Sequence, residues 1–245
     1  MNISSFASAD PIFLVIPAGG RGLRMGGGVP KQFRDWGGIP LLEATVRAFL
    51  APAMPRLSAI ALAVPEDRLE QVRSWRFGVP TLVVPGGETR QESVAGALAV
   101  LADRPEARVL IHDAVRPFPP PGPVLEALEA IGGPEGWDGA VLGERSTDTL
   151  KRVDPSGLIL GTEPREGIFR AQTPQVARLG TWREAFAWAR TTGFVGTDDV
   201  SLLEALGRRV KLVPSPPSNL KLTTSEDWER ARSLAWIPGP QGVVD

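Results

Sequence analysis

The chain has 245 residues, a length that allows one large α/β domain or two small domains. It contains no cysteine, which excludes disulfides, thiolate metal sites and cysteine nucleophiles. Its net charge of −1 gives no support for a nucleic-acid partner or a charged membrane surface, and no apolar run approaches the ~20 residues that span a bilayer. The first ten residues lack the cationic start and apolar core of a signal peptide, so we expect a cytoplasmic protein.

The first predicted element is a strand over residues 12–16, where every side chain is apolar. Such a run is typical of a strand buried on both faces of a parallel sheet. After Pro17 comes a segment rich in glycine that also contains Arg21, Arg24 and Lys31. Its glycines are Gly19, Gly20, Gly22, Gly26, Gly27 and Gly28. Glycine lets backbone N–H groups approach an anion, and Arg and Lys supply positive charge, so we predict a loop that holds polyphosphate. A flexible surface loop with solvated arginines is the alternative.

Two established phosphate-binding motifs do not match this loop. The Walker motif needs Gly-Lys followed by Ser or Thr, whereas this chain has Pro30-Lys31-Gln32. The dinucleotide fingerprint needs a third glycine where Met25 stands, and Pro30 interrupts the helix that should follow. The loop instead resembles the G-x-G-x-R-M…P-K loop of nucleotidylyltransferases, which move a nucleotide from a triphosphate to an acceptor.

Apolar runs and helical periodicity alternate along the rest of the chain. Strands are predicted over residues 57–64, 79–84, 108–111, 139–142 and 209–213. Helices are predicted over residues 41–50, 93–101, 124–131, 181–190, 198–206 and 225–234, with another opening at residues 65–67. This alternation predicts a single α/β domain over residues 10–236, a Rossmann-like, mostly parallel twisted sheet with helices on both faces. We expect residues 1–9 and 237–245 to be flexible ends.

The pattern changes between residues 146 and 176. Residues 147–153 and 158–161 are predicted to be extended, with a turn over residues 154–157 between them. The two runs are too polar to be buried on both faces. We therefore predict a β-arm over residues 146–170 that projects from the sheet and is covered by a second subunit in a homodimer. A hairpin that lies on its own domain is the alternative.

Four segments with binding potential fall at the carboxyl ends of predicted strands. They are residues 19–31, 86–93, 113–116 and 197–199. In an open parallel sheet the ligand lies beyond the carboxyl ends of the strands, so we expect these segments to converge on one crevice.

Single side chains at these ends have more than one interpretation. Asp113 ends a buried strand and is expected to point into the crevice, where a hard oxygen ligand suits Mg²⁺. A turn or helix N-cap aspartate is an equal interpretation. The only histidine, His112, is interpreted as structural, because its side chain should face away from that of Asp113. Asp198 and Asp199 also have an interpretation as acids at a helix N-terminus, where the dipole favours them.

Taken together, these stretches resemble the 2-C-methyl-D-erythritol 4-phosphate cytidylyltransferase family. The resemblance rests on PAGGRGLRM…PKQ, GGETRQESV, HDAVRP, TDTLKR, RAQTPQV, GTDD and SNLKLTTSED, in the expected order over about residues 12–232. It implies transfer of CMP from CTP to methylerythritol phosphate with Mg²⁺, giving 4-diphosphocytidyl-2-C-methyl-D-erythritol and pyrophosphate.

The resemblance also implies roles for individual residues. Arg24, Lys31 and Lys221 match catalytic cations, and Asp113 is the metal-ligand candidate. The positions that match CTP-binding residues are Ala18, Gly19, Gly20, Gly22, Gly87, Glu88 and Ser93. The positions that match acceptor-binding residues are Arg116, Thr149, Arg165, Thr173, Thr197 and Lys221. The two arm residues in this set are expected to reach the site of the neighbouring subunit.

Direct attack of the acceptor phosphate on the α-phosphorus needs no covalent intermediate, so catalysis should consist of positioning and charge neutralisation. The nearest alternative is a cytidylyltransferase that acts on ribitol 5-phosphate or another polyol phosphate, although Arg165 and its arm favour methylerythritol phosphate. A nucleotide-binding regulatory module without catalysis is a further alternative, against which Arg24, Lys31 and Asp113 argue together.

Overall fold

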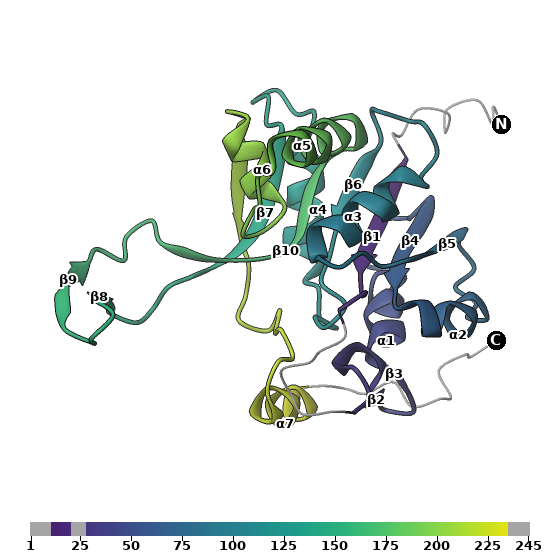
Figure 1. Ribbon diagram of the computed structural model, residues 1–245, viewed down its shortest axis with the longest axis horizontal. Coiled ribbons are helices and arrows are strands. Elements are labelled where there is room, and N and C mark those ends of the chain that lie inside the picture. Colours follow the sequence, from purple (N-terminus) through teal and green to yellow (C-terminus); the bar gives the residue numbers. More distant parts are fainter. Residues whose placement is uncertain (1–10, 21–27, 235–245) are drawn as a thin grey trace.

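The computed structural model describes residues 11–20 and 28–234. Its centre is a seven-stranded sheet in the order β11-β7-β10-β6-β1-β4-β5 (Figure 1). The strands are β1 (Ile12–Pro17), β4 (Ala59–Val64), β5 (Thr81–Pro85), β6 (Arg108–Ile111), β7 (Gly139–Arg145), β10 (Phe169–Arg178) and β11 (Val210–Pro214). Neighbouring strands are parallel except β10, which is antiparallel to both β6 and β7. The predicted single α/β domain with a mostly parallel sheet is confirmed.

The strand β1 lies between β4 and β6 and is buried on both faces of the sheet. Leu14 and Ile16 belong to one hydrophobic cluster, whereas Phe13 and Val15 belong to a second cluster. Because successive side chains of a strand point to opposite faces, an apolar run of this kind requires cover on both sides. The glycine-rich loop therefore starts from a strand that is fixed on every side.

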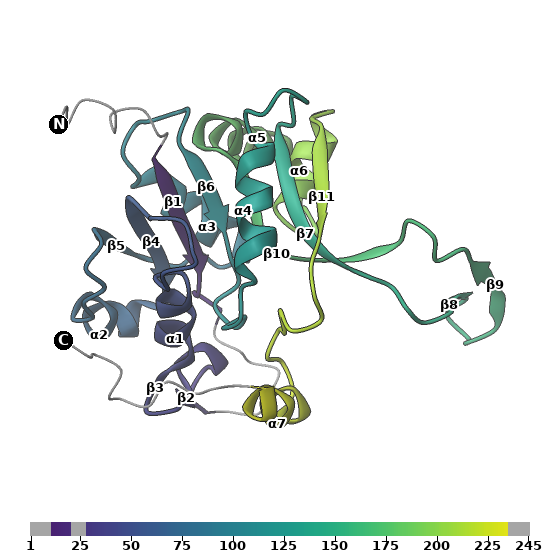
Figure 2. The same ribbon diagram turned by 180° about the vertical axis from the view of Figure 1, so that it is seen from behind.

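Helices supply this cover on both faces (Figures 1 and 2). The helices α1 (Leu41–Ala48), α2 (Leu69–Arg73) and α4 (Pro121–Ala130) contribute to the cluster of Leu14. The helices α3 (Arg90–Ala99), α5 (Leu179–Thr192) and α6 (Val200–Ala205) contribute to the cluster of Phe13. In the described part of the chain, no helix is both long and apolar enough to cross a bilayer.

A third, smaller hydrophobic cluster lies beyond the carboxyl ends of the strands. It joins α7 (Ser225–Leu234) to the short hairpin of β2 (Asp35–Trp36) and β3 (Ile39–Pro40). Trp36 and Trp228 pack edge to face in this cluster, with ring centroids 5.3 Å apart. Two short 3₁₀ turns, η2 (Lys31–Phe33) and η3 (Glu66–Arg68), precede β2 and α2.

Several predicted helices are present with shifted ends. The helix predicted from residue 93 begins at Arg90, because Thr89 and Glu92 form a capping box before it. The helix predicted over residues 198–206 is limited to Val200–Ala205.

The central strand β10 is not among the predicted strands. Its sequence contains Gln172, Thr173 and Gln175, which are buried in the sheet although they are polar. These side chains have partners: Gln175 Nε2 donates to Asp198 Oδ2 at 2.7 Å, and Gln175 Oε1 accepts from Val200 N at 2.8 Å. A buried strand with such side chains does not show the apolar pattern on which prediction relies, because its stability depends on partners distant in sequence.

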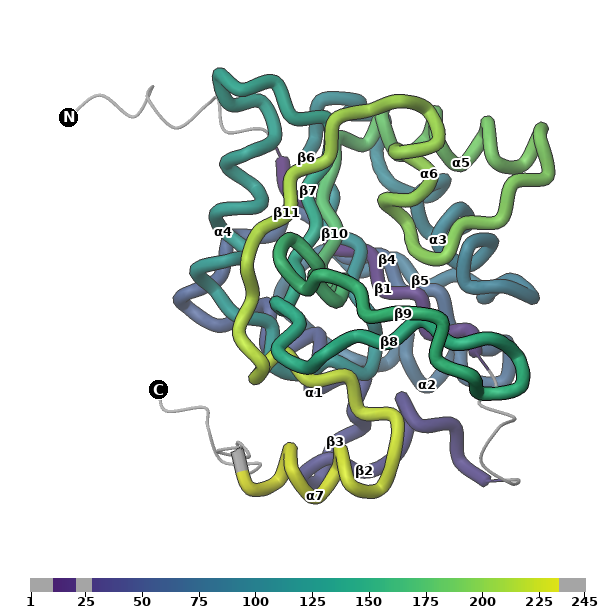
Figure 3. The backbone as a smooth tube through the Cα atoms, turned by 90° about the vertical axis from the view of Figure 1, so that its left-hand side faces the viewer, coloured from purple at the N-terminus to yellow at the C-terminus, as the bar shows by residue number. Residues whose placement is uncertain are grey.

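The predicted hairpin is present and stands away from the main sheet (Figures 1 and 2). It consists of β8 (Leu150–Val153) and β9 (Ile159–Glu163), which pair with each other and with no other strand of the described chain. Figure 3 looks toward this arm from its free end. Leu158, Ile159 and Leu160 are 63%, 58% and 60% exposed, so the arm presents apolar side chains that the described part of the chain does not cover.

The buried role of Gln175 can be tested by stability measurements. Replacing Gln175 with Leu leaves the Val200 N–H group without its partner, which we expect to lower the free energy of unfolding by about 1–3 kcal/mol. Gln71→Leu is the matched control, because Gln71 is exposed and its loss should change stability by no more than about 0.5 kcal/mol. Urea unfolding measures both, and equal effects of the two substitutions would contradict the buried role of Gln175 in β10.

Candidate active site

The loops that follow β1 and β5 touch at a pair of glycines. A Cβ atom added to Gly19 would lie 2.9 Å from Gly86 Cα, and one added to Gly86 would lie 2.5 Å from Gly19 Cα. These backbones can approach so closely only because neither residue has a side chain. The two segments predicted to bind CTP therefore lie against each other at the carboxyl ends of the strands.

Gln32 holds the first of these loops in place. Its Nε2 donates to the carbonyl oxygen of Ala18 at 2.7 Å and to that of Gly20 at 2.8 Å. The Gln32 side chain is buried, and the two bonds fix the direction of both carbonyl groups. Gln32 is not among the site residues predicted from the sequence, although it belongs to the PKQ motif.

The predicted catalytic residues of this loop are described in part. Lys31 Nζ donates to the carbonyl oxygen of Thr223, just before α7, so the lysine joins the loop to the C-terminal part of the chain. Gly22 and Arg24 lie outside the described residues, and their roles remain predictions from the sequence.

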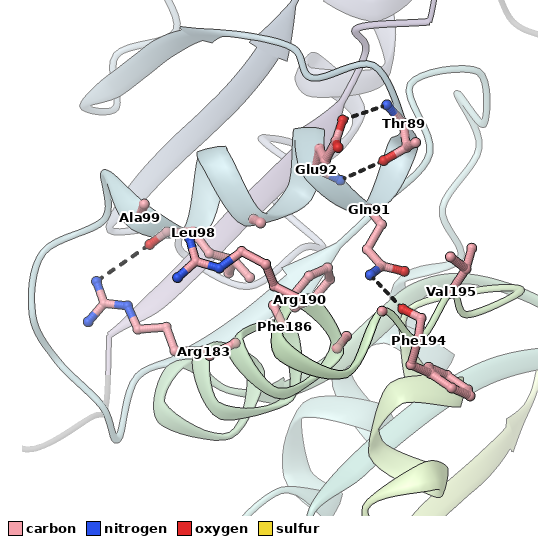
Figure 4. A pocket seen from close by; sticks show the side chains of 14 residues that line it. Thr89, Gln91, Glu92, Leu98, Ala99, Arg183, Phe186, Arg190, Phe194 and Val195 are labelled. Atoms are coloured by element: carbon pink, nitrogen blue, oxygen red, sulfur yellow. Dashed lines mark hydrogen bonds between the residues drawn. The ribbon is translucent and has the colours of Figure 1, made fainter.

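The second loop is shaped by hydrogen bonds within itself. Ser93 Oγ accepts from Gly87 N at 3.1 Å and donates to the Thr89 carbonyl oxygen at 2.9 Å. The capping box of Thr89 and Glu92 closes the same turn (Figure 4). A Cβ atom on Gly87 would meet the Glu92 side chain at 2.3 Å. The Ser93 hydroxyl thus bonds within the loop on both sides, whereas the Glu88 side chain is exposed.

Asp113 lies directly after β6 and is surrounded by cations. Its Oδ2 lies 3.0 Å from Lys221 Nζ and 3.5 Å from Arg116 Nε, and its Oδ1 lies 3.3 Å from Arg90 Nε. Burial alone would raise the pKa of Asp113, but Arg90, Lys221 and Arg116 outweigh burial and hold this pKa well below its usual range. The carboxylate is therefore ionised, and the surrounding group has excess positive charge, as an anionic substrate requires.

Arg90 also forms a bidentate ion pair that the sequence did not reveal. Its Nη1 and Nη2 lie 2.7 Å and 2.8 Å from the two carboxylate oxygens of Asp199. Burial raises the pKa of Asp199 and Arg90 opposes that rise. Asp199 does lie at the N-cap of α6, as the interpretation as a helix N-terminal acid expects, but its side chain forms no capping bond and pairs with Arg90 instead. Asp198 does accept a hydrogen bond from Ser201 N at 3.1 Å in the first turn of α6.

His112 and Thr173 form a buried chain of hydrogen bonds behind Asp113. His112 Nε2 bonds to the carbonyl oxygen of Arg116 at 2.9 Å, so this nitrogen must hold the proton. Nδ1 then accepts from the Thr173 hydroxyl at 3.1 Å, and that hydroxyl accepts from Asp113 N at 3.0 Å. Burial lowers the pKa of His112 from 6.5 to about 4, so the ring is neutral and structural.

Three of the predicted acceptor residues gather around Asp113. Lys221 and Arg116 contact its carboxylate, and Thr173 contacts its backbone N–H group. Arg116 Nη1 also donates to the carbonyl oxygen of Asn219 at 2.7 Å, which fixes the segment that carries Lys221.

The other predicted acceptor residues lie elsewhere. Thr197 is exposed in the loop before α6, close to Arg90 and Asp199 around a cavity of about 60 Å³. Thr149 and Arg165 lie on the projecting arm, where Arg165 Nη1 donates to the carbonyl oxygen of Thr147 at 2.6 Å. Within one chain, the arm of β8 and β9 that these two residues flank stands away from β6, which Asp113 follows (Figure 1).

The described residues do not form a complete metal site at Asp113. Both carboxylate oxygens face cations, and residues 11–20 and 28–234 contain no group of three acidic, His or Cys side chains that could hold a metal ion. Mg²⁺ usually takes one or two carboxylates and completes its shell with water and phosphate oxygens, so a single carboxylate is compatible with this ion. Asp113 as a ligand of Mg²⁺ therefore stays a prediction from the sequence.

A separate apolar cavity of about 450 Å³ lies between α3 and α5 (Figure 4). It is lined by Leu98, Phe186 and Phe194 among others, and by none of the residues that contact Asp113. The strand ends, where the charged groups converge, are thus distinct from this cavity.

Known proteins resemble the chain over nearly its whole length. Residues 12–235 match the family model of 2-C-methyl-D-erythritol 4-phosphate cytidylyltransferase. The protein of that name from Acidobacterium capsulatum is 41% identical over 232 residues, which cover 90% of this chain and 95% of the relative. The crystal structure of the Francisella tularensis protein of that name superposes with a TM-score of 0.79 at 28% identity, covering 92% of this chain and all of the other. That from Thermus thermophilus gives a TM-score of 0.72 at 33% identity, covering 90% and 96%.

The buried neutral state of His112 predicts how stability depends on pH. The unfolded chain takes up a proton near pH 6.5, whereas folded His112 does so only near pH 4. The free energy of unfolding should therefore be independent of this residue above pH 6.5 and fall as the pH drops from 6.5 towards 4, by up to about 1.4 kcal/mol per pH unit. His112 is the only histidine, so His112→Gln should flatten the profile between pH 6.5 and 5. Denaturant unfolding without added metal measures the slope, and the same slope in both proteins would contradict the assignment.

Proposed function

The chain belongs to the 2-C-methyl-D-erythritol 4-phosphate cytidylyltransferase family, and we propose that its crevice at the carboxyl ends of the strands is where CMP passes from CTP to 2-C-methyl-D-erythritol 4-phosphate. The products are 4-diphosphocytidyl-2-C-methyl-D-erythritol and pyrophosphate. An oxygen of the acceptor phosphate forms a bond with the α-phosphorus of CTP, and the bond from that phosphorus to the oxygen of the leaving pyrophosphate breaks.

The observation that supports this location is the cation cluster beside the glycine loops. Lys221, Arg116 and Arg90 converge on the single carboxylate of Asp113. Two anionic substrates must approach each other in this reaction, and fixed cations reduce their mutual repulsion without reorganisation. A bare phosphate monoester is recognised well by such a group of charged donors.

Residue roles follow from the two sides of the crevice. On the CTP side, the backbone at Ala18, Gly19, Gly20 and Gly87 can approach the nucleotide closely because side chains are small or absent. Lys31, together with Arg24 and Gly22 of the same loop, would hold the triphosphate. On the acceptor side, Lys221 and Arg116 would hold the methylerythritol phosphate group and keep it in line with the α-phosphorus.

Nucleotidyltransferases of this kind generally use a divalent metal ion, and we propose Mg²⁺. The phosphate oxygens of CTP would supply ligands of this ion, and Asp113 is the candidate for a carboxylate ligand from the protein. No step assigned to the residues of the chain depends on where that ion is bound.

The projecting arm supports a homodimer. Its exposed Leu158, Ile159 and Leu160 are not covered by residues 11–20 or 28–234, and a second copy of the chain could cover them. A second copy would also give the polar residues of the arm a partner site. In such a dimer, Thr149 and Arg165 would complete the acceptor site of the partner subunit.

The reaction can be tested with three of the four lysines of the chain. We expect pyrophosphate release from CTP with methylerythritol phosphate, and little with ribitol 5-phosphate. Lys31→Ala and Lys221→Ala should each lower kcat by about 10²–10³-fold, because each removes a donor that stabilises developing charge. Lys211→Ala is the control, since Lys211 pairs with Glu126 on the surface of β11 and α4. Preference for ribitol 5-phosphate would overturn the acceptor, and an equal loss in all three variants would overturn the roles of Lys31 and Lys221.

The arm can be tested by complementation. A mixture of inactive Arg24→Ala and Arg165→Ala proteins should recover part of the activity, because one of the two sites in a mixed dimer then contains neither substitution. Subunit exchange is verified by mass spectrometry of the mixture. Absence of recovery in exchanged dimers would show that Arg165 does not act in the partner's site.

A further inference from the structure

Arg90 occupies the first position of α3, directly after the loop of residues 86–89. It lies between this loop and the cations Arg116 and Lys221 at Asp113. All three nitrogens of its guanidinium group are directed at carboxylates: Nη1 and Nη2 at Asp199, and Nε at Asp113. Asp199 is 2% exposed and Asp113 is 8% exposed, so both acids depend on this arginine for compensation of their buried charge. Burial would lower the pKa of Arg90, but the two carboxylates raise it above its usual value.

The next residue strengthens the same connection. Gln91 Nε2 donates to the carbonyl oxygen of Phe194 at 3.1 Å (Figure 4). Gln91 Oε1 accepts from Gly196 N at 3.2 Å. The first turn of α3 is therefore bonded to the loop of residues 194–199 at several points. The same turn is continuous with the loop of residues 86–89 through the capping box of Thr89.

We propose that Arg90 is a positioning residue, which acts through its ion pairs with Asp199 and Asp113. By these pairs it fixes the carboxylate of Asp113, which Lys221 and Arg116 also contact. Arg90 thereby links the loop of residues 86–89 to these acceptor-side cations. The inference rests on the proposed function and adds a residue to it. Arg90 itself need not touch either substrate. Its effect reaches the reaction because Lys221 Nζ takes its position from Asp113 Oδ2, 3.0 Å away.

The geometry requires arginine and not merely a positive charge. The planar guanidinium group holds one carboxylate with two parallel bonds and still offers Nε to another, whereas a lysine ammonium group is a single point charge. Arg90→Lys should therefore fail to restore function even though it conserves the net charge. A displacement of about 1 Å at the reacting groups can cost about 10²-fold in rate.

The position of Lys221 can be observed without any reaction. The chain has four lysines, Lys31, Lys151, Lys211 and Lys221, so ¹³C reductive methylation gives few lysine signals in NMR spectra, and substitution of each lysine assigns them. In the double variant Arg90→Gln/Asp199→Asn, which leaves no unpaired charge, we expect the Lys221 signal to shift while those of Lys151 and Lys211 stay unchanged. The kcat of this variant and of Arg90→Lys should fall by about 10²-fold.

The matched control is an arginine–glutamate ion pair on the surface, formed by none of the residues around Asp113. Arg208 Nη2 lies 2.8 Å and 2.7 Å from the two carboxylate oxygens of Glu184 on the surface, and Arg208→Gln/Glu184→Gln should change neither the Lys221 signal nor kcat. An unmoved Lys221 signal in Arg90→Gln/Asp199→Asn, or wild-type kcat in Arg90→Lys, would overturn the proposal. If the double variant does not fold, the Lys221 signal of Arg90→Lys decides. If the wild-type protein forms no product, the proposed function fails while the Lys221 signal still tests the role of Arg90.

Discussion

The buried carboxylate of Asp113 is the constraint on which the crevice depends. A carboxylate removed from water without partners is very costly, and here Arg90, Arg116 and Lys221 supply the compensation. They come from three separate parts of the chain: the start of α3, the loop after β6 and the segment before α7. The carboxylate of Asp113 therefore joins three cations, and Arg90 is held by Asp199 as well.

The antiparallel strand β10 explains how polar groups reach this part of the sheet. Its pairing with β7 shifts register between Ala171 and Gln175, and Thr173 lies in the irregular stretch, where its hydroxyl group bonds to Asp113 N. Register irregularities are common beside active sites because they redirect side chains. A regular parallel strand at this position would present an apolar face, and His112 would lose the partner that keeps Nδ1 satisfied.

The sequence predicted what depends on local pattern. The apolar run of β1, the projecting hairpin and the placement of Asp113 after β6 follow from residues that are neighbours in the chain. The family motifs singled out Arg116 and Lys221 as acceptor-binding candidates. The sequence did not predict β10, Gln32 or the ion pair of Arg90 with Asp199. Arg90 and Asp199 are 109 positions apart, so no local pattern records their contact. The same holds for Asp113. The sequence predicted its position at the end of a strand, but its ion pairs with Arg90 and Lys221 join distant parts of the chain and are known only from the structure.

The role of Asp113 as organiser of the site is tested most directly by the affinity of the Asp113→Asn variant for methylerythritol phosphate, measured by calorimetry at constant salt with cooperative unfolding as a check on the fold. The substitution keeps the shape of the side chain and makes the site more positive by one charge. If attraction of charge alone governed binding, the variant would hold the anionic substrate more tightly. We expect instead that Lys221 and Arg116 lose their fixed positions and that binding weakens by about tenfold or more, a loss of about 1.4 kcal/mol. Equal or tighter binding would contradict the claim that Asp113 organises the site.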